Sequence, residues 1–381
     1  MKPTKITIVL GTRPEAIKLS PVIRELKKRP ECFETIVCVT SQHKEMLREA
    51  LKSFEIQIDH DLDIMREKQS LEHITSATMS RLGHVFAQER PDMVMVQGDT
   101  STAFAAALTA YYEKILICHV EAGLRTFHKY DPFPEEANRR LLSCLADIHF
   151  APTERARGNL IREGISGRDI LVTGNTGIDA LLWMVQKTRE SNFRVPWLPA
   201  MCDGKRLVLV TCHRRESFGP KIEEVCLALR EIVRTHPDVM VVFPVHPNPN
   251  VRCVVHRTLG GLPRVHLAEP VDYQGFVFLM MNACLILTDS GGIQEEAPVL
   301  GKPVLVLREA TERPEAVESQ SAKLVGTSPE SIVPEVNRLL GDPLVLQRMS
   351  FEHSPYGDGR AAKRIVDHLD DLRAILRKHS C

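Results

Sequence analysis

Short apolar runs alternate with segments of helical spacing along almost the whole chain. The apolar residues of the intervening segments recur every three or four positions, as Leu19, Ile23 and Leu26 do, which predicts helices with one buried face. Short apolar runs joined by such helices are typical of parallel sheets that are covered on both faces. The predicted strands are residues 6–10, 35–40, 93–97, 115–120, 147–150, 170–173, 207–211, 239–243, 265–267, 283–287 and 303–307.

The alternation is interrupted by a polar, proline-containing stretch at residues 186–205, just after a helix that is expected to end near Met184. The predicted fold class is therefore α/β, with two Rossmann-like doubly wound domains at residues 1–185 and 205–360. A chain of 381 residues is long enough for two cores of ordinary size. An amphipathic helix at residues 361–381 is expected to pack across to the N-terminal domain. A ligand is expected between the two domains.

The charge balance excludes two classes of partner. The chain has 49 basic and 49 acidic residues, so no net field attracts nucleic acid or an anionic membrane, and neither is expected to bind. The longest apolar region, residues 276–287, is interrupted by Asn282 and cannot span a bilayer. The apolar run near the N-terminus is too short for a signal peptide, so a soluble, cytoplasmic protein is predicted. The ten cysteines form no Cys-x-x-Cys pair and are expected to be reduced thiols.

Residues 289–296 read Asp-Ser-Gly-Gly-Ile-Gln-Glu-Glu and directly follow a predicted strand. A strand that ends in Ser290, Gly291 and Gly292 and opens a helix presents backbone N–H groups at the positive end of the helix dipole, which favours a phosphate. Further along this helix, Glu296 could accept hydrogen bonds from a sugar diol. The segment fits a nucleotide site, although the glycines of an ordinary strand-to-helix bend would give the same pattern.

Charged residues collect where strands of the N-terminal half are predicted to end. Arg13 and Lys18 lie near the start of the first helix, where cations oppose the helix dipole, so they indicate either an anionic ligand or a solvated surface turn. Asp99 and Glu121 follow two further strands, and Glu135 begins a later helix. Because parallel strands end at the same edge of a sheet, these three acids are predicted to converge on a site of proton transfer or hydroxyl recognition.

In the C-terminal half, His213, Arg214 and His246 follow predicted strands and, with the Ser290 turn, fit a diphosphate pocket. Phe276 could stack on a nucleotide base or could pack in the core. No pair of histidines has the spacing of a metal site, so no metal is predicted. No G-x-G-x-x-G motif follows a strand, which argues against a tightly bound dinucleotide, and no cofactor is expected.

Taken in order, these segments resemble the motifs of the non-hydrolysing UDP-N-acetylglucosamine 2-epimerase family. The resemblance implies a GT-B-like arrangement of the two domains. It also implies an isomerase that converts UDP-N-acetylglucosamine (UDP-GlcNAc) reversibly to UDP-N-acetylmannosamine (UDP-ManNAc) for bacterial surface polysaccharides. The matching segments are GTRPE (11–15), QH (42–43), QGDT (97–100), HVEAGLRT (119–126), PEEANR (134–139), GNT (174–176), HRRE (213–216), HPN (246–248), DSGG (289–292) and TERPE (311–315).

The reaction that the resemblance implies proceeds by elimination of UDP to 2-acetamidoglucal and re-addition of UDP with inversion at C2. The family pattern places acid and base roles on Asp99, Glu121 and Glu135, and places His213 beside the diphosphate. It does not say which carboxylate removes the C2 proton and which returns it. The residues with implied substrate contacts are Arg13, Ser290, Gly291 and Gly292 for the phosphates, Glu296 for the ribose, Phe276 for the uracil, and Lys18, His246 and Arg313 as additional ligands.

The resemblance also implies a homodimer that is activated by its own substrate at a neighbouring site. That site uses residues around Gln42, Glu135, Arg214 and His246. This sequence departs from the regulated pattern, because Glu45 replaces a usual Gln, Lys68 a usual Arg and Ser217 a common Asn. Weaker activation is therefore predicted.

Three other activities remain open from the sequence. They are a hydrolysing epimerase that releases UDP and free ManNAc, a UDP-sugar glycosyltransferase of the GT-B type, and a UDP-sugar sensor without catalysis. The intact GTRPE motif favours the non-hydrolysing epimerase over the hydrolysing one. The presence of Asp99, Glu121 and His213 argues against the sensor, which would tolerate their loss.

Overall fold

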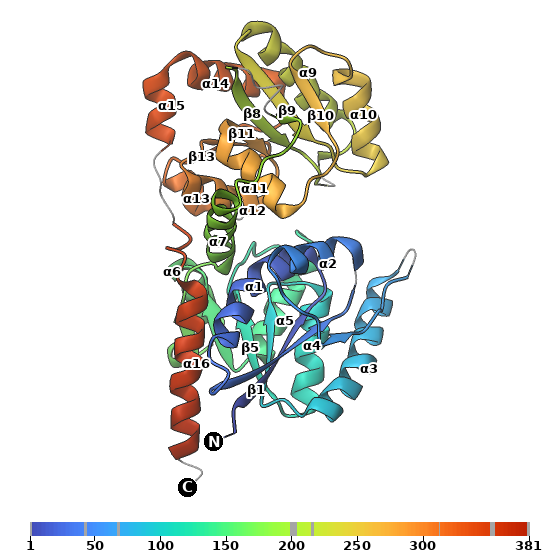
Figure 1. The fold of residues 1–381 in the computed structure, drawn as a ribbon, viewed down its shortest axis with the longest axis vertical. Helices are drawn as coiled ribbons and strands as arrows, with labels where there is room; N and C mark the ends of the chain where they lie inside the picture. Colours follow the sequence, from blue (N-terminus) through green and yellow to red (C-terminus); the bar gives the residue numbers. More distant parts are fainter. Residues whose placement is uncertain are drawn as a thin grey trace. The chain divides into compact units, whose positions relative to one another are not determined.

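The chain divides into two compact units that each have their own sheet and core. The N-terminal unit comprises Met1–Ala180 and Tyr356–Cys381, and the C-terminal unit comprises Leu181–Pro355. The computed structural model describes residues 2–41, 44–66, 69–198, 204–214, 217–311, 313–350 and 355–378. In each unit, helices lie on both faces of a sheet (Figure 1). Both units are therefore α/β folds.

The N-terminal sheet has seven parallel strands in the order β3-β2-β1-β4-β5-β6-β7. The strands are β1 (Thr4–Leu10), β2 (Phe33–Val39), β3 (His60–Asp61), β4 (Met93–Gln97), β5 (Leu116–Val120), β6 (Ile148–Ala151) and β7 (Ile170–Val172). The helices of this half are α1 (Arg13–Lys27), α2 (Lys44–Ser53), α3 (Leu71–Glu89), α4 (Ser101–Tyr112), α5 (Glu135–Leu145) and α6 (Glu154–Arg162). Helix α7 (Thr176–Glu190) begins in this unit and continues into the C-terminal unit.

The C-terminal sheet has six parallel strands in the order β10-β9-β8-β11-β12-β13. The strands are β8 (Arg206–Thr211), β9 (Val239–Pro244), β10 (Val265–Ala268), β11 (Ala283–Thr288), β12 (Val304–Val306) and β13 (Ala322–Leu324). The helices around it are α9 (Pro220–Thr235), α10 (Pro249–Leu259), α11 (Tyr273–Asn282), α12 (Gly291–Glu296), α13 (Pro314–Glu318), α14 (Pro329–Gly341) and α15 (Pro343–Met349).

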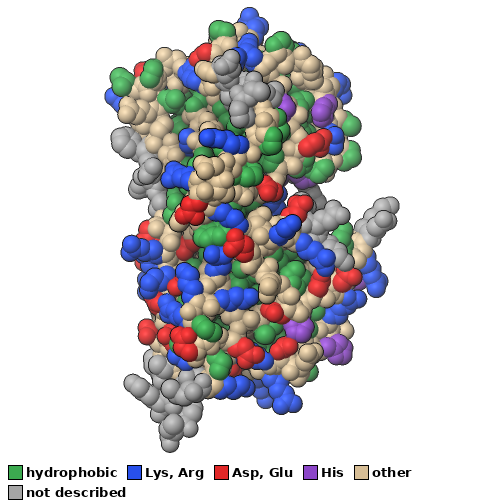
Figure 2. Space-filling view, viewed as in Figure 1, with side chains coloured by type: hydrophobic (Ala, Val, Ile, Leu, Met, Phe, Trp, Pro, Cys, Tyr) green, Lys and Arg blue, Asp and Glu red, His purple; other side chains and the backbone are tan. Residues whose placement is uncertain are grey.

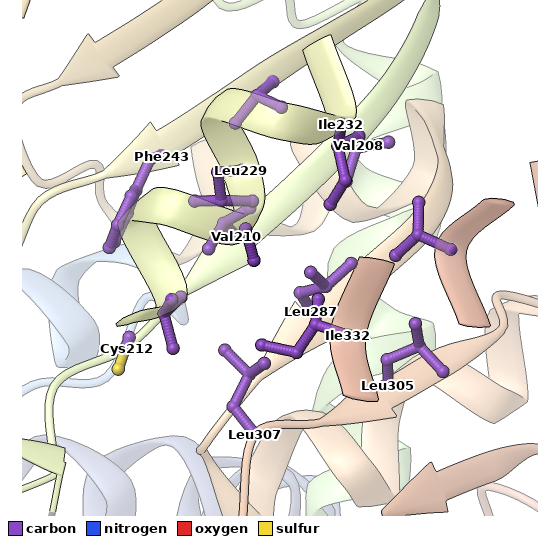
Figure 3. Packing of buried hydrophobic residues seen from close by; sticks show 14 of the residues in the cluster. Val208, Val210, Cys212, Leu229, Ile232, Phe243, Leu287, Leu305, Leu307 and Ile332 are labelled. Atoms are coloured by element: carbon purple, nitrogen blue, oxygen red, sulfur yellow. The ribbon is translucent and has the colours of Figure 1, made fainter. Parts of the chain in front are cut away.

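The central strands are apolar at nearly every position because both of their faces are covered. In β8, Val208 and Val210 belong to the cluster that packs against α9, while the intervening Leu207 and Leu209 are buried on the opposite face. Figure 3 shows Leu229 and Ile232 of α9 above this face of the strand. This double burial explains why a continuous apolar run, rather than an alternating one, predicts these strands.

The last helix, α16 (Ala361–Lys378), belongs to the N-terminal unit and packs on α1. Its first backbone N–H groups are held by Asp179 of α7, whose carboxylate accepts hydrogen bonds from Ala361 N at 3.2 Å and Ala362 N at 2.9 Å. Burial raises the pKa of Asp179 to about 6, although the two N–H donors oppose that rise. Arg29, two residues after the end of α1, pairs with Asp367 on α16 at 2.6 Å. Helix α16 is therefore held against the N-terminal unit by both packing and polar contacts.

The predicted fold class of two Rossmann-like doubly wound domains is confirmed, and each predicted strand is present. Two short strands were not predicted. The two-residue β3 has no apolar run, and the three-residue β13 contains an exposed Lys323. The helix expected to end near Met184 continues to Glu190, where Gln186 donates a hydrogen bond to the Glu190 carboxylate at 2.7 Å. That polar turn of helix has no apolar periodicity from which to predict it.

The face of the molecule seen in Figure 2 has no dominant sign of charge. Basic and acidic side chains are interspersed over the visible face (Figure 2), as the equal numbers of the two types predict. Of the helices in the described part of the chain, none combines the length and the apolar character needed to cross a membrane.

Candidate active site

Each sheet has a switch point, where the chain leaves one strand toward one edge and later returns beside that strand to build the other edge. In the N-terminal sheet it lies between β1 and β4, and in the C-terminal sheet between β8 and β11. We call the loops after β1 and β4 the first switch point and the loops after β8 and β11 the second. Ligands bind at such places in open α/β sheets because the loops on the two sides diverge.

Asp99 lies at the first switch point, one residue after Gly98, which follows β4 and has a positive φ of 71°. Its Oδ2 atom is 2.7 Å from both Nε and Nη2 of Arg139 on α5. The neighbouring Asn138 donates from Nδ2 to the Asp99 carbonyl oxygen at 2.9 Å. Helix α5 therefore fixes both the backbone and the carboxylate of Asp99, whose side chain remains 24% exposed.

Beneath this turn, His119 of β5 bonds the Gly98 carbonyl oxygen through Nε2 at 2.7 Å. The ring is buried, and burial lowers the pKa of His119 to about 3. A neutral imidazole that donates to a carbonyl supports the turn without adding charge to it. His119 is thus a structural support of the Asp99 loop.

Glu121 follows β5 and has a positive φ of 63°. Its Oε2 atom forms an ion pair with Lys18 of α1 and accepts a hydrogen bond from Nε2 of Gln97 at 3.1 Å. The Lys18 side chain is 14% exposed and that of Glu121 only 8%. The structure therefore brings together Lys18 and Glu121, which lie far apart in sequence, beside the strand end that precedes Asp99.

The two adjacent acids at the start of α5 have different surroundings. Glu135 is the first residue of the helix and is half-buried. Glu136 is fully buried, accepts N–H bonds from Thr126 at 3.0 Å and Phe127 at 3.1 Å, and pairs with Arg139. Glu136 therefore holds the loop that precedes α5, and Glu135 keeps its place among the candidate site residues.

Arg13 opens α1 and is half-buried, and its side chain makes no hydrogen bond or ion pair with any described residue. Two positions later, Glu15 has no solvent exposure. Its Oε2 atom accepts from Gly11 N, Thr12 N and Thr12 Oγ1 at 2.7–3.1 Å, and its Oε1 atom accepts from Thr100 Oγ1 at 2.8 Å. All four donors are uncharged, and burial raises the pKa of Glu15 to about 7.

At the second switch point, a buried Asp289 directly follows β11 and holds the loop after β8. Its Oδ2 atom accepts hydrogen bonds from the backbone N–H groups of His213 and Arg214, both at 2.8 Å, and from Ser217 Oγ at 3.1 Å. The His213 ring stacks on that of His246, with ring centroids 5.7 Å apart and planes inclined by 15°. Burial, and then the nearby His213, lower the pKa of His246. The two predicted histidines are therefore neighbours.

The Ser290 turn has one tightly packed glycine and one open glycine. A Cβ atom on Gly291 would lie 3.1 Å from Cζ of Arg313, whose Nε atom pairs with Glu295 at 2.9 Å. A Cβ atom on Gly292 would meet nothing closer than Ser290 Oγ at 3.9 Å. The Ser290 side chain does not cap α12. The Ser290 hydroxyl therefore does not occupy the first N–H groups of this helix.

Glu296, at the end of α12, is linked to α11 through Tyr273. The Tyr273 hydroxyl donates to Glu296 Oε1 at 2.9 Å, and Tyr273 itself is only 4% exposed. Phe276 lies one turn further along α11 and is half-buried, whereas Val277, Phe278 and Leu279 after it belong to the core. The proposed contacts to ribose and base thus come from two helices that are joined by a hydrogen bond.

Part of the predicted regulatory site lies outside the described residues. Gln42 and Lys68 are not described, and neither is the side chain of Glu45. Arg214 is half-buried on the loop that Asp289 holds. Within the described ranges, no three His, Cys, Asp or Glu side chains are arranged to hold a metal ion.

Sequence reasoning did not predict the roles of Glu15, Arg139, Tyr273 and Asp289. Each stands inside or near a segment that was singled out, and of the four only Glu15 carried a signal of its own. The Thr-x-x-Glu spacing from Thr12 to Glu15 is the pattern of a capping box and could have drawn attention to that carboxylate. Contacts of Arg139 and Asp289 depend on strand order, which local sequence does not encode.

Comparison with known proteins identifies the family. The sequence model described as UDP-N-acetylglucosamine 2-epimerase matches residues 24–370. A UDP-N-acetylglucosamine 2-epimerase of Escherichia coli (strain K12) is 52% identical over 376 residues, which are 98% of this chain and 100% of that protein. The chain belongs to the UDP-N-acetylglucosamine 2-epimerase family. The predicted family of isomerases is thereby confirmed.

Solved structures agree with this membership of the 2-epimerase family. The UDP-GlcNAc 2-epimerase of Neisseria meningitidis, solved bound to UDP-GlcNAc, superposes with a TM-score of 0.91 at 47% identity and covers 96% of this chain and 99% of its own. The enzyme of Methanocaldococcus jannaschii, solved with UDP-GlcNAc and UDP, gives a TM-score of 0.82 at 35% identity, with 96% and 99% covered. Both relatives bind the nucleotide sugar that the family name specifies.

Proposed function

We propose that this chain interconverts UDP-GlcNAc and UDP-ManNAc by eliminating UDP and adding it back through 2-acetamidoglucal. Membership of the 2-epimerase family and the two ligand-bound relatives support the substrate. The observation that carries the mechanism is the pair of carboxylates, Asp99 and Glu121, which follow adjacent strands and are each held by a cationic side chain. Two fixed carboxylates beside each other suit a reaction that moves a proton off C2 and then back onto it.

Carboxylates alone cannot remove the C2 proton, because the reaction also requires UDP to leave C1. In the intact sugar, the C2 proton is not next to a carbonyl group, so its direct removal at neutral pH is too unfavourable. Departure of UDP from C1 places positive character on C1 and makes the C2 proton more acidic. Loss of that proton forms the C1–C2 double bond of 2-acetamidoglucal. Re-addition of UDP to C1, with a proton delivered to the opposite face of C2, then gives the epimer.

We assign the sugar chemistry to the N-terminal unit. Asp99, Glu121 and Glu135 are proposed as the acids and bases at C2. Arg139 and Lys18 hold the first two of these carboxylates at fixed positions, which favours proton transfer because a small displacement of such a group costs rate. Lys18 also places a positive charge beside Glu121.

We assign the diphosphate to the C-terminal unit, with Arg13 as an additional cation. The open backbone at Gly292 and the uncapped start of α12 favour an anion near Ser290. Arg313 and His213 add donors whose strength matters as negative charge develops on the departing oxygen. Glu296 and Phe276 are proposed to bind ribose and uracil, and His246 supports His213.

The deciding experiment is incubation of the purified chain with UDP-GlcNAc in deuterated water, followed by proton NMR. We expect UDP-ManNAc with deuterium at C2, and deuterium entering the remaining UDP-GlcNAc as the reaction approaches equilibrium. Release of free ManNAc together with UDP would assign the chain to a hydrolysing epimerase instead. If neither C2 exchange nor epimer forms, both proposals fail.

Three further expectations accompany this proposal. A homodimer is expected from the family resemblance and is tested by light scattering of the purified chain. Weak activation by UDP-GlcNAc is expected, and a hyperbolic rather than sigmoidal rate curve would agree with it. The product would supply a bacterial surface polysaccharide, which loss of the gene should deplete of ManNAc-derived sugars.

A further inference from the structure

We propose that Asp289 is the positioning residue of His213, holding the loop that carries it and orienting its ring through the facing Oδ1 and Nδ1 atoms. This inference rests on the proposed function, in which His213 lies beside the departing diphosphate. The proposal concerns a carboxylate with no proposed substrate contact, since Asp289 has no solvent exposure at all.

The backbone geometry supplies the first half of the argument. Strands β8 and β11 are paired neighbours, and Thr211 and Thr288 at their ends share a hydrogen bond of 2.7 Å between hydroxyl groups. The chain beyond β11 therefore lies directly beside the chain beyond β8. Beyond β8, the backbone N–H groups of His213 and Arg214 both donate to Oδ2 of Asp289. A carboxylate that accepts two backbone N–H groups at 2.8 Å fixes the loop as a capping residue fixes a helix start.

The second half of the argument is the other oxygen of Asp289. Oδ1 is buried and makes no hydrogen bond to any described residue. It lies 3.5 Å from Nδ1 of His213, close enough for a small rotation of the ring to complete a hydrogen bond. A buried carboxylate oxygen is costly without a donor, so Asp289 favours the tautomer that carries its proton on Nδ1. The lone pair is then on Nε2, on the other side of a ring that is 40% exposed.

This arrangement fits a group that must exchange a proton or hydrogen bond with a leaving oxygen. With Nδ1 committed to Asp289, only Nε2 is available to the diphosphate or the sugar. The stacked His246 limits rotation of the ring, since the two planes are nearly parallel. His246 accepts a backbone N–H bond from Asn248 at its own Nδ1 atom, so its tautomer is also fixed.

The informative variant is Asp289→Asn, because an amide oxygen can still accept from both backbone N–H groups. Its NH₂ group would then face Nδ1 of His213 and favour the opposite tautomer. We expect kcat for epimerisation to fall on the order of 10²-fold or more, as the misoriented base of a catalytic triad does. UDP affinity is expected to remain within about 3-fold of the wild type, because the loop itself is retained.

The matched control is Ser217→Ala. It removes the third donor to Oδ2 of Asp289 but leaves Oδ1 and the His213 ring untouched. We expect its kcat to stay within about 3-fold of the wild type, since one hydrogen bond to a charged group is lost without exposing a new site. A loss as large as that of Asp289→Asn would show that loop stability, not ring orientation, is what Asp289 provides, and would overturn the proposal.

The ring tautomer can be measured directly in the full-length protein labelled with ¹⁵N at histidine. Long-range proton–nitrogen correlation spectra, assigned with a His213→Gln variant, should show wild-type His213 protonated on Nδ1 when neutral and Asp289→Asn protonated on Nε2. Wild-type His213 with its proton on Nε2 would overturn the proposal whether or not the variant folds. Failure of the wild type to exchange deuterium at C2 would instead refute the proposed function and leave the tautomer result standing.

Discussion

The first and second switch points are each bridged by a buried carboxylate, but the carboxylate comes from opposite sides. At the first, Glu15 on the helix after β1 reaches Thr100 after β4. At the second, Asp289 after β11 reaches the backbone of His213 after β8. In both sheets the bridge crosses between the two strands at which the strand order reverses. Two units with the same topology thus use the same device in opposite directions.

The direction of the bridge decides what the helix start can bind. Glu15 occupies the N–H groups of Gly11 and Thr12 at the start of its own helix, so an anionic ligand would meet a carboxylate there. Asp289 turns its carboxylate toward the neighbouring loop and leaves the start of α12 open. For this reason the diphosphate is proposed to bind at the second switch point. At the first, the proposed contact with an anion comes from the side chain of Arg13 instead.

The largest expected effect breaks the chemistry of the first switch point. Asp99→Asn keeps the size of the side chain but removes a base or acid from the proposed site. We expect the rate of deuterium exchange at C2 to fall by about 10²- to 10⁴-fold, the usual contribution of a positioned acid or base. Proton NMR in deuterated water measures this rate. UDP affinity, measured by calorimetry, should change little because UDP is proposed to bind at the second switch point.

Asp147→Asn is the matched control for that experiment. Asp147 immediately precedes β6, and its carboxylate accepts the N–H of Ile117 at the opposite end of the sheet. We expect C2 exchange to be unchanged. Loss of UDP binding in Asp99→Asn would contradict the comparison, since it would mean that Asp99 shapes the whole fold.

The second prediction tests the bridge of the first switch point through pH. Burial raises the pKa of Glu15 from 4.5 to about 7, so ionising it costs stability in the folded state only. Protonated Glu15 contributes its full stability below pH 4.5, and this contribution is lost as the pH rises through 7. The free energy of unfolding of Glu15→Gln relative to that of the wild type should therefore increase as the pH is raised from 5 to 8, by up to about 3 kcal/mol. Thermal unfolding of both proteins at the two pH values measures this gain.

Glu136→Gln provides the contrast. Glu136 is as fully buried as Glu15, but it pairs with Arg139 and Arg140. Its neutralisation removes one of the two carboxylates that pair with the buried Arg139, the other being Asp99, so we expect a loss of stability at both pH values. An equal stability difference between Glu15→Gln and the wild type at pH 5 and pH 8 would show that Glu15 is not held ionised at a cost.

The third prediction separates packing from binding within the second switch point. Gly292→Ala adds a methyl group where the protein leaves space, so the helix should gain about 0.5–1 kcal/mol. The same methyl group lies where a phosphate is proposed to approach, and UDP affinity should fall on the order of 10-fold, about 1.4 kcal/mol.

Gly291→Ala is its partner variant. It would press on the Arg313 guanidinium at 3.1 Å and should lower the unfolding temperature by a few degrees. Calorimetric titration with UDP and thermal unfolding of both variants give the four numbers needed. Unchanged UDP affinity in Gly292→Ala would remove the phosphate from this turn.

Some of these features follow from local sequence and others do not. Strands such as β4 and β11 were predictable because burial on both faces makes nearly every residue apolar, and Asp99 and Ser290 were predictable because they follow those strands. The Glu15–Thr100 contact spans 85 positions and the His213–Asp289 contact spans 76. Both depend on which strands are neighbours, and the apolar pattern is the same for many strand orders.

Two neighbouring residues show a similar limit at closer range. Glu135 and Glu136 are chemically identical in the sequence, yet only Glu136 turns into the fold to hold the backbone of Thr126 and Phe127. The family motif contains both acids and does not separate their roles. Burial, which depends on the loop packed above α5, is what distinguishes them.

The smallest expected effect concerns Tyr273, which holds Glu296 at the second switch point through a hydrogen bond of 2.9 Å. Tyr273→Phe removes the hydroxyl but keeps the buried ring, so the fold should be retained. If Glu296 binds the ribose, its freedom in the variant should weaken UDP binding by about 2- to 10-fold, the worth of one hydrogen bond. The wild type should also bind UDP more tightly than 2′-deoxy-UDP, and the variant should discriminate less between them. Gln274→Ala is the control. Gln274 lies one residue away on α11, its side chain bonds only Ser191 among the described residues, at 3.4 Å, and the variant should keep the wild-type preference. Equal affinity of the wild type for the two nucleotides would mean that Glu296 does not bind the ribose 2′-hydroxyl, because a carboxylate that binds both hydroxyl groups loses a hydrogen bond when one of them is removed.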